Sequence, residues 1–234
     1  MKILGIEASA ISASVSICED DLILGEYYLH TGKTHSQTLM PITEQLLITT
    51  DSSLADIDAI AVTTGPGSFT GLRIALAAVK GMAMGKDIPC IEVSTLESIA
   101  YNLKGFDGIV APTMDARCNQ VYTALFRLSD GTATRLTEDT AMSLEDYSEM
   151  LSSYKDEKIY LAGDGLNITK KFLTEKGIAF IVPPSRMRTQ NATSTALLGV
   201  EKYNRGETLS YKDIVPKYLR LPQAERELKK KTNK

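Results

Sequence analysis

Short apolar runs alternate with longer amphipathic segments along the first hundred residues of the chain. Three runs at the start, 2–8, 12–18 and 22–29, are predicted strands, and the acidic triplet before Leu22 predicts a tight hairpin between the last two. Residues 34–50 place apolar side chains on one side of a predicted helix, in which Pro41 is tolerated only near the first turn. The chain therefore opens with three strands and a helix.

Two further strands and two helices are predicted before residue 105. Residues 58–64 and 88–93 have the apolar character of buried strands, and residues 70–85 form a predicted helix between them. Ser94 is expected to cap a third helix, with Glu97 three residues later completing a capping box. The predicted order is strand, strand, strand, helix, strand, helix, strand, helix.

Near Gly105 a similar pattern begins again. The predicted strands are 106–117, 119–128, 158–162 and 178–184, and the predicted helices are 143–154, 165–176 and 191–204. This repetition of topology predicts an α/β protein of two similar lobes, residues 1–104 and 105–220, followed by a charged tail, 221–234. Alternatively, the last helix crosses back to the first lobe.

Charge and cysteine content narrow the class of protein. The 234 residues include 26 Lys and Arg against 29 Asp and Glu, a net charge of -3, so any RNA contact would need a local patch or a partner. Cys18, Cys90 and Cys118 are far apart and odd in number, which favours reduced thiols over a disulfide framework. The apolar run before Glu7 is too short for a signal peptide, and no segment is long enough to span a bilayer, so we expect a cytoplasmic protein without membrane contact.

The stretch GPGSFTG, residues 65–71, joins a predicted strand to a predicted helix. Its glycines and the following helix N-terminus have the physical properties of an anion site, but Leu72 and Arg73 stand where a Walker A motif has Lys and Ser or Thr. A strand-to-helix turn that binds no ligand is the alternative. Candidate nucleotide-proximal residues are Glu7, Gly65, Gly67, Ser68 and Thr70.

The helix after this turn is almost uncharged. Between residues 72 and 85 only Arg73 and Lys80 carry charge, and a helix apolar nearly all round must be covered on more than one face. Burial between the sheet and the helix at 36–50 is one interpretation, and a helix-mediated protein interface is the other. The candidate interface residues are Leu39, Ile42, Leu46, Leu72, Arg73, Ala75, Ala78, Val79, Gly81 and Met82.

Residues for catalysis or metal binding are scarce. His30 and His35 are the only histidines, and neither has a His or Cys partner at a ligand spacing. There is no GxSxG elbow, and no Ser/His/Asp or Cys/His triad can be assembled. Asp115 and Arg117 could pair with each other. We therefore predict no catalytic residue and no metal site.

The motifs ILGIEAS, AVTTGPGSFTGLRIALAAVKGMAMG, PCIEVSTLESIA, MDARCNQVYTALF and VPKYLR together resemble the TsaB (YeaZ) family over nearly the whole chain. The resemblance implies two ribonuclease-H-like lobes of the actin/sugar-kinase/Hsp70 superfamily. It also implies a non-catalytic role beside a paralogue, TsaD, in forming N6-threonylcarbamoyladenosine in tRNA. The metal-binding HxxxH of that paralogue falls here on Thr95 and Ile99, which cannot replace it.

The same resemblance implies the partners of the chain. It predicts a heterodimer with a TsaD-type paralogue through helices of the first lobe, a homodimer when the chain is alone, and binding of a TsaE-type ATPase to the assembled pair. No cofactor is expected on this chain, although ATP or ADP could lie near the junction, and tRNA is expected to reach it only through the complex. A metal-free peptidase and a small-molecule kinase are the two enzymatic alternatives.

Overall fold

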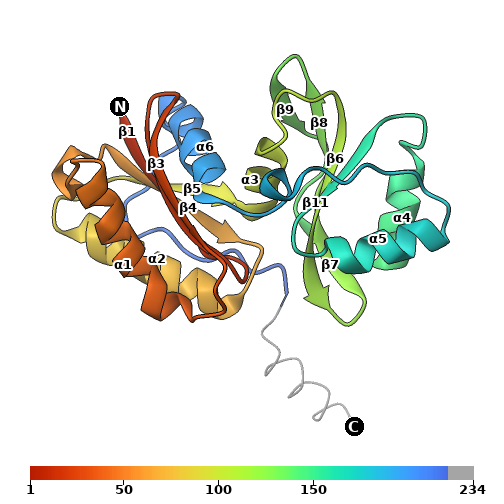
Figure 1. Cartoon of the computed structure of the whole chain (residues 1–234), viewed down its shortest axis with the longest axis horizontal. Helices are drawn as coiled ribbons and strands as arrows, with labels where there is room; N and C mark the ends of the chain where they lie inside the picture. Colours follow the sequence, from red (N-terminus) through yellow and green to blue (C-terminus); the bar gives the residue numbers. More distant parts are fainter. Residues whose placement is uncertain (221–234) are drawn as a thin grey trace, which may run out of the picture.

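The computed structural model describes residues 1–220; the predicted tail, 221–234, lies outside the described residues. Two lobes lie side by side, each built on a sheet (Figure 1). The first sheet has the order β3-β2-β1-β4-β5. Its strands are β1 (Lys2–Glu7), β2 (Ala13–Glu19), β3 (Leu22–Leu29), β4 (Ala59–Gly65) and β5 (Cys90–Ser94). β1, β2 and β3 pair antiparallel, whereas β4 and β5 run parallel to β1, so the strands predicted for the first lobe are confirmed.

Helices α1 (His35–Thr49) and α2 (Phe69–Met84) lie side by side on one face of this sheet (Figure 1). Their apolar stripes enter the core of the first lobe, because spacings of three and four residues put these side chains on one helix face. Pro41 is the seventh residue of α1 and exposed, so this helix accommodates a proline beyond its first turn, the only place where the sequence predicted that it would be tolerated. The 3-10 turn Leu54–Asp56 leads from α1 into β4.

The second sheet is centred on β6 (Gly108–Arg117), which pairs with β7 (Gln120–Thr123), β8 (Phe126–Ser129) and β11 (Ile159–Ala162). Outer strands β9 (Thr132–Arg135) and β10 (Thr140–Ser143) pair with β8 and β7. Helices α4 (Leu144–Ser152) and α5 (Leu166–Glu175) pack against this sheet and share one apolar cluster with it.

Three expectations for the second lobe were incomplete or wrong. β9 and β10 were not predicted, because both are short and contain few apolar residues. Residues 178–184 do not form a strand but make a single bridge between Ile181 and Tyr160, since the following Pro183 and Pro184 have no N–H to continue a ladder. The predicted strand 119–128 is interrupted between Thr123 and Phe126.

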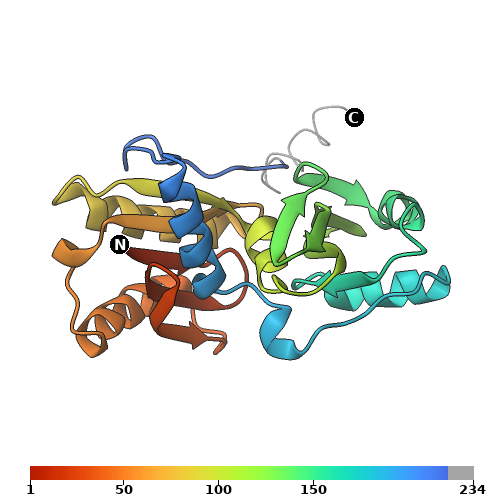
Figure 2. The same cartoon turned by 90° about the horizontal axis from the view of Figure 1, so that it is seen from above.

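Helices α3 (Thr95–Tyr101) and α6 (Ala192–Asn204) connect the lobes. The apolar residues of α3 pack with those of the second sheet, while α6 packs on the face of the first sheet opposite α1 and α2 (Figures 1 and 2). The approach of α6 is close: a Cβ on Gly199 would lie 2.6 Å from the Cβ of Ala61. The last helix of the segment 105–220 thus contributes to the first lobe, as the alternative had allowed.

Residues 205–220, here called the C-terminal strap, run from α6 back across the first lobe to the second (Figure 2). Leu209 forms a backbone bridge with Cys90 at the edge of the first sheet, and Ile214 is fully buried in the core. At its end the Arg220 guanidinium donates to the carbonyl of Ala116 at 2.5 Å. In the part of the chain that the structure describes, no helix is long and apolar enough to cross a membrane.

The two glycines of α2 give opposite predictions for stability. Replacing Gly71 by Ala should lower the free energy of unfolding by roughly 1–3 kcal/mol, because the new methyl group would overlap the backbone carbonyl of Ala8. At Gly81 no atom lies within 4 Å of the added Cβ, so Gly81→Ala should raise it, by up to about 1 kcal/mol. Urea denaturation of both variants measures the difference, and equal effects would contradict this packing of α2.

Candidate functional site

The GPGSFTG turn packs against the loop that follows β1. The amide of Ser68 donates to the Ser9 carbonyl at 2.7 Å, and a Cβ on Gly67 would lie 2.5 Å from the same oxygen. Ser68 also caps α2, its hydroxyl accepting from the amide of Gly71 at 3.3 Å, while Thr70 is exposed. Gly67 therefore allows the Ser9 carbonyl to approach the turn closely. Because this carbonyl accepts from the Ser68 amide, one of the N–H groups that an anion would need is already occupied.

Glu7, at the end of β1, is completely buried. Its Oε1 accepts from the amide of Ser9 at 2.5 Å, and its Oε2 has no hydrogen-bond partner among the described residues. Burial raises the pKa of the Glu7 carboxyl above its usual range, because the charged form loses its hydration, and the hydrogen bonds from Ser9 offset this only in part. A raised pKa makes this carboxyl a weaker ligand for a cation, because a cation binds the deprotonated form.

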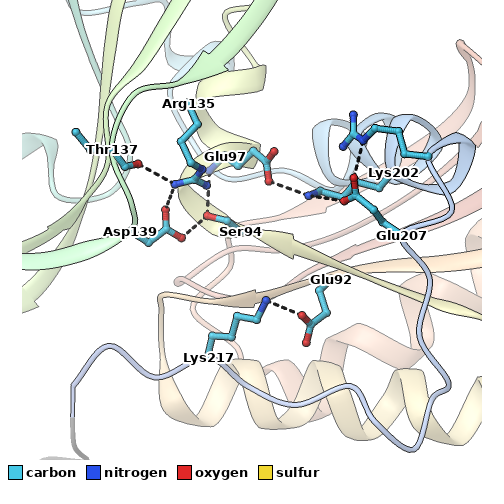
Figure 3. A network of polar contacts seen from close by, with 10 residues as sticks. Glu92, Ser94, Glu97, Arg135, Thr137, Asp139, Lys202, Glu207 and Lys217 are labelled. Atoms are coloured by element: carbon cyan, nitrogen blue, oxygen red, sulfur yellow. Dashed lines mark hydrogen bonds and ion pairs between the residues drawn. The ribbon is translucent and has the colours of Figure 1, made fainter.

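A cavity of about 370 Å³ lies beside the turn, between the lobes. Its lining includes Gly65, Pro66, Glu138 and Leu219. Figure 3 shows the charged groups around it. Arg135 pairs with Asp139 at 2.5 Å, and the Ser94 hydroxyl donates to the same carboxylate, which ties the second lobe to the end of β5.

The other cations of this cavity are also neutralised. Lys217 of the strap pairs with Glu92 at 2.6 Å, and Lys202 of α6 lies 3.4 Å from Glu97 (Figure 3). Ser94 caps α3 through the amide of Glu97, as predicted, but the Glu97 carboxylate faces Lys202. Because each cation that lines the cavity has a carboxylate partner, the cavity joins the lobes electrostatically and offers no surplus positive charge to an anion.

The remaining polar candidates do not converge on one place. His35 contacts the Ala10 carbonyl at 2.8 Å through Nε2, and Asp115 pairs with Arg117 at 3.2 Å at the end of β6. Thr95 and Ile99 are fully buried in α3. Within residues 1–220, no group of three or more His, Cys, Asp and Glu side chains could hold a metal ion.

The candidate interface residues divide between the core and the surface. Seven of them are buried inside the first lobe: Leu39, Ile42, Leu46, Leu72, Ala75, Val79 and Met82. Ala78 is partly buried against the same core, and only Arg73 and Gly81 are exposed. The apolar stripe predicted as an interface thus faces the sheet, and a partner of the folded lobe can reach only the opposite side of these helices.

That opposite side, here called the outer helix face, carries exposed apolar and small residues on both helices, and Glu44 is exposed between those of α1. Its members are Met40 and Ile48 of α1 and Ala77, Gly81 and Met84 of α2. Ile48 is 61% exposed and Met84 is 65% exposed, values that are high for large apolar side chains. In the sequence, the part of this face on α2 is marked by small residues at intervals of four, Ala77, Gly81 and Gly85.

Comparison with known proteins shows which family this chain resembles. Residues 29–228 match the family model "TsaD: tRNA N6-adenosine threonylcarbamoyltransferase". The chain is 34% identical to the Bacillus subtilis "tRNA threonylcarbamoyladenosine biosynthesis protein TsaB", over 96% of both chains. It is 28% identical to the Escherichia coli protein of the same name, over 94% of this chain and 95% of that one. The chain belongs to the TsaB family.

Solved structures agree with this family and confirm the fold. YeaZ from Pseudomonas aeruginosa superimposes with a TM-score of 0.80 at 24% identity, over 93% of this chain and 99% of that chain. Component A of the Acidaminococcus fermentans (R)-2-hydroxyglutaryl-CoA dehydratase matches with a TM-score of 0.52 at 10% identity, covering 87% and 99%. The predicted α/β fold of two lobes is thus confirmed, and the chain is a TsaB homologue of tRNA threonylcarbamoyladenosine biosynthesis.

The raised pKa of Glu7 predicts how stability depends on pH. A carboxyl that holds its proton more tightly in the folded state contributes stability below its unfolded pKa and loses that contribution as pH rises through the folded pKa. Glu7→Gln keeps the Oε1 acceptor for Ser9 and removes the titration. Its gain in unfolding free energy over the wild-type protein should therefore grow as the pH rises above about 4.5, the ordinary pKa of a glutamic acid.

Urea denaturation across this pH range tests the prediction. The control is Glu149→Gln, at an exposed position of α4, which should show no such growth. A constant difference between the Glu7→Gln variant and the wild-type protein at all pH values would show that Glu7 is not held in its neutral form.

Proposed function

We propose that this chain is a non-catalytic scaffold or activator subunit of the complex that forms N6-threonylcarbamoyladenosine in tRNA. It binds the catalytic TsaD-type paralogue through α1 and α2 of its first lobe. The observation that carries this proposal is the outer helix face, an exposed surface of apolar and small residues on a chain whose relatives are named for this modification.

The apolar side chains of the outer helix face are not covered by any part of the first lobe. Apolar side chains such as Met84 and Ile48 gain free energy when they leave water, and the first lobe provides nothing to cover them. Small residues at Ala77 and Gly81 allow a partner helix to approach closely. A helix of a second protein packed on this face would cover the apolar side chains and approach closely at the small residues. A paralogue with the same fold would present matching helices.

The arrangement around the turn supports an accessory role over catalysis. The carbonyl of Ser9 fills the turn, burial raises the pKa of the Glu7 carboxyl, and each cation lining the cavity beside the turn is paired. Chemistry would then take place on the partner, and ATP or ADP, if used, would lie at the junction rather than on this chain. In the same proposal a TsaE-type ATPase joins the assembled pair, and the chain forms a homodimer when the paralogue is absent.

Two substitutions on α2 test the interface. Ala77→Glu places a charge on the outer helix face, and Gly81→Leu fills the space that a partner helix would occupy. Each should weaken binding to the TsaD-type paralogue at least about 30-fold, equivalent to roughly 2 kcal/mol. Because both positions are exposed, the monomer should fold normally. Ala78 is avoided, because its side chain packs partly against the core.

Size-exclusion chromatography and calorimetric titration of the purified pair provide the measurement. The control, Lys170→Glu, changes an exposed residue of α5 in the other lobe and should leave binding intact. A complex that forms normally with both α2 variants would show that the outer helix face is not the interface.

A further inference from the structure

Four cations beside and along the C-terminal strap have no carboxylate partner among the described residues: Arg73, Lys80, Lys212 and Arg220. Arg73 and Lys80 are seven residues apart on α2, so they lie on the same side of the helix about two turns apart. The Lys80 ammonium group donates to the carbonyl of Lys212, which brings this helix side against the strap. Arg73 contacts Tyr218 of the strap, so all four cations lie on the strap or against it, and together they are here called the strap surface.

Arg73 is oriented by a neutral group. Its Nε donates to the Tyr218 hydroxyl at 2.8 Å, and its guanidinium lies 5.6 Å from the centre of the Tyr218 ring. That ring stacks on Phe69 with centroids 4.3 Å apart, which fixes the position of the phenol. The two terminal nitrogens of Arg73 have no partner among residues 1–220. A guanidinium held in place with free donors is prepared for a phosphate group.

Arg220 has a similar arrangement at the other end of the strap. Its Nη1 donates to the carbonyl of Ala116, again a neutral acceptor, so the full positive charge remains available. Positively charged residues are also frequent in the sequence of the strap and of the residues that follow it. Residues 205–234 contain nine Lys and Arg against four Asp and Glu, whereas the whole chain has a net charge of -3. Positive charge is therefore concentrated at this end of an otherwise acidic protein.

We propose that the strap surface, with Arg73 and Arg220 as its oriented contacts, binds the phosphate backbone of RNA. The identity of that RNA, the tRNA substrate of the complex, rests on the proposed function. This adds a direct contact to the expectation that tRNA reaches the chain only through the complex. An acidic protein is the less favoured ligand, because lysines are depleted in protein interfaces, and the sequence after Arg220 adds mostly Lys.

Fluorescence anisotropy with a labelled tRNA transcript and the full chain tests this proposal. Binding should weaken as salt is raised, because cations that neutralise phosphates release counterions. The double variant Arg73→Gln, Arg220→Gln should bind about tenfold more weakly at low salt and show a shallower salt dependence. Tyr218→Phe retains the ring stack but removes the hydroxyl that orients Arg73, so it should lose about half of the binding free energy lost by the double variant.

The matched control removes the same charge elsewhere. Lys170→Gln with Lys171→Gln, at exposed positions of α5, should change the affinity less than about twofold. Equal losses in the two double variants, or no tRNA binding at low salt, would overturn the proposal. If the double variant Arg73→Gln, Arg220→Gln loses a protein partner but binds tRNA as the wild-type chain does, the proposal is also overturned. The surface would then be assigned to an acidic protein.

Failure of the RNA proposal can be distinguished from failure of the proposed binding to the paralogue. Gly81→Leu should abolish binding to the paralogue and leave tRNA binding by the isolated chain unchanged, since Gly81 lies outside the strap surface. If that variant keeps its partner while the arginine variant loses tRNA, the interface proposal fails and the RNA proposal stands.

Discussion

The exchange of α3 and α6 between the lobes is the constraint on which the rest of the structure depends. The apolar side of α3 is covered by the second sheet, and α6 lies so close to the first sheet that Gly5 and Gly199 have no room for a side chain. The two helices also meet through the hydroxyls of Ser98 and Thr195, 3.1 Å apart. Neither lobe can bury its core without the other, so their relative position is fixed by packing rather than by a linker.

Fixed lobes explain how charged groups of the two lobes and the strap can pair around the cavity between the lobes. The strap follows α6 and can cross from the first sheet to the second lobe because the two are held at a constant separation. Along this path Lys217 pairs with Glu92, while Arg135 and Asp139 of the second lobe hold Ser94 of the first. A fold does not determine a function. Here the cations that line the cavity between the lobes are paired with carboxylates of the same chain.

Periodicity predicted what is buried, and it therefore predicted the first lobe better than the surface. Alternating and continuous apolar runs identified all five strands of the first sheet, whereas β9 and β10, with few apolar residues, gave no such signal. Periodicity alone cannot separate core residues from interface residues, and Leu39 and Val79 are buried against the sheet in this chain. Neither the ion pairs of the cavity nor the position of the strap can be derived from sequence, because both depend on contacts between distant segments.

Gly81 is the residue whose presence the isolated chain does not explain. Glycine inside a helix costs about 1 kcal/mol relative to alanine, because the unfolded chain has more conformations to lose. At Gly71 this cost is offset, since a Cβ would overlap the carbonyl of Ala8, but around Gly81 there is open space within 4 Å. Within the described lobe, nothing requires glycine at this position. A helix from outside the chain that approaches the α2 backbone closely would supply the missing reason, and it would cover Met84 and Ile48 at the same time.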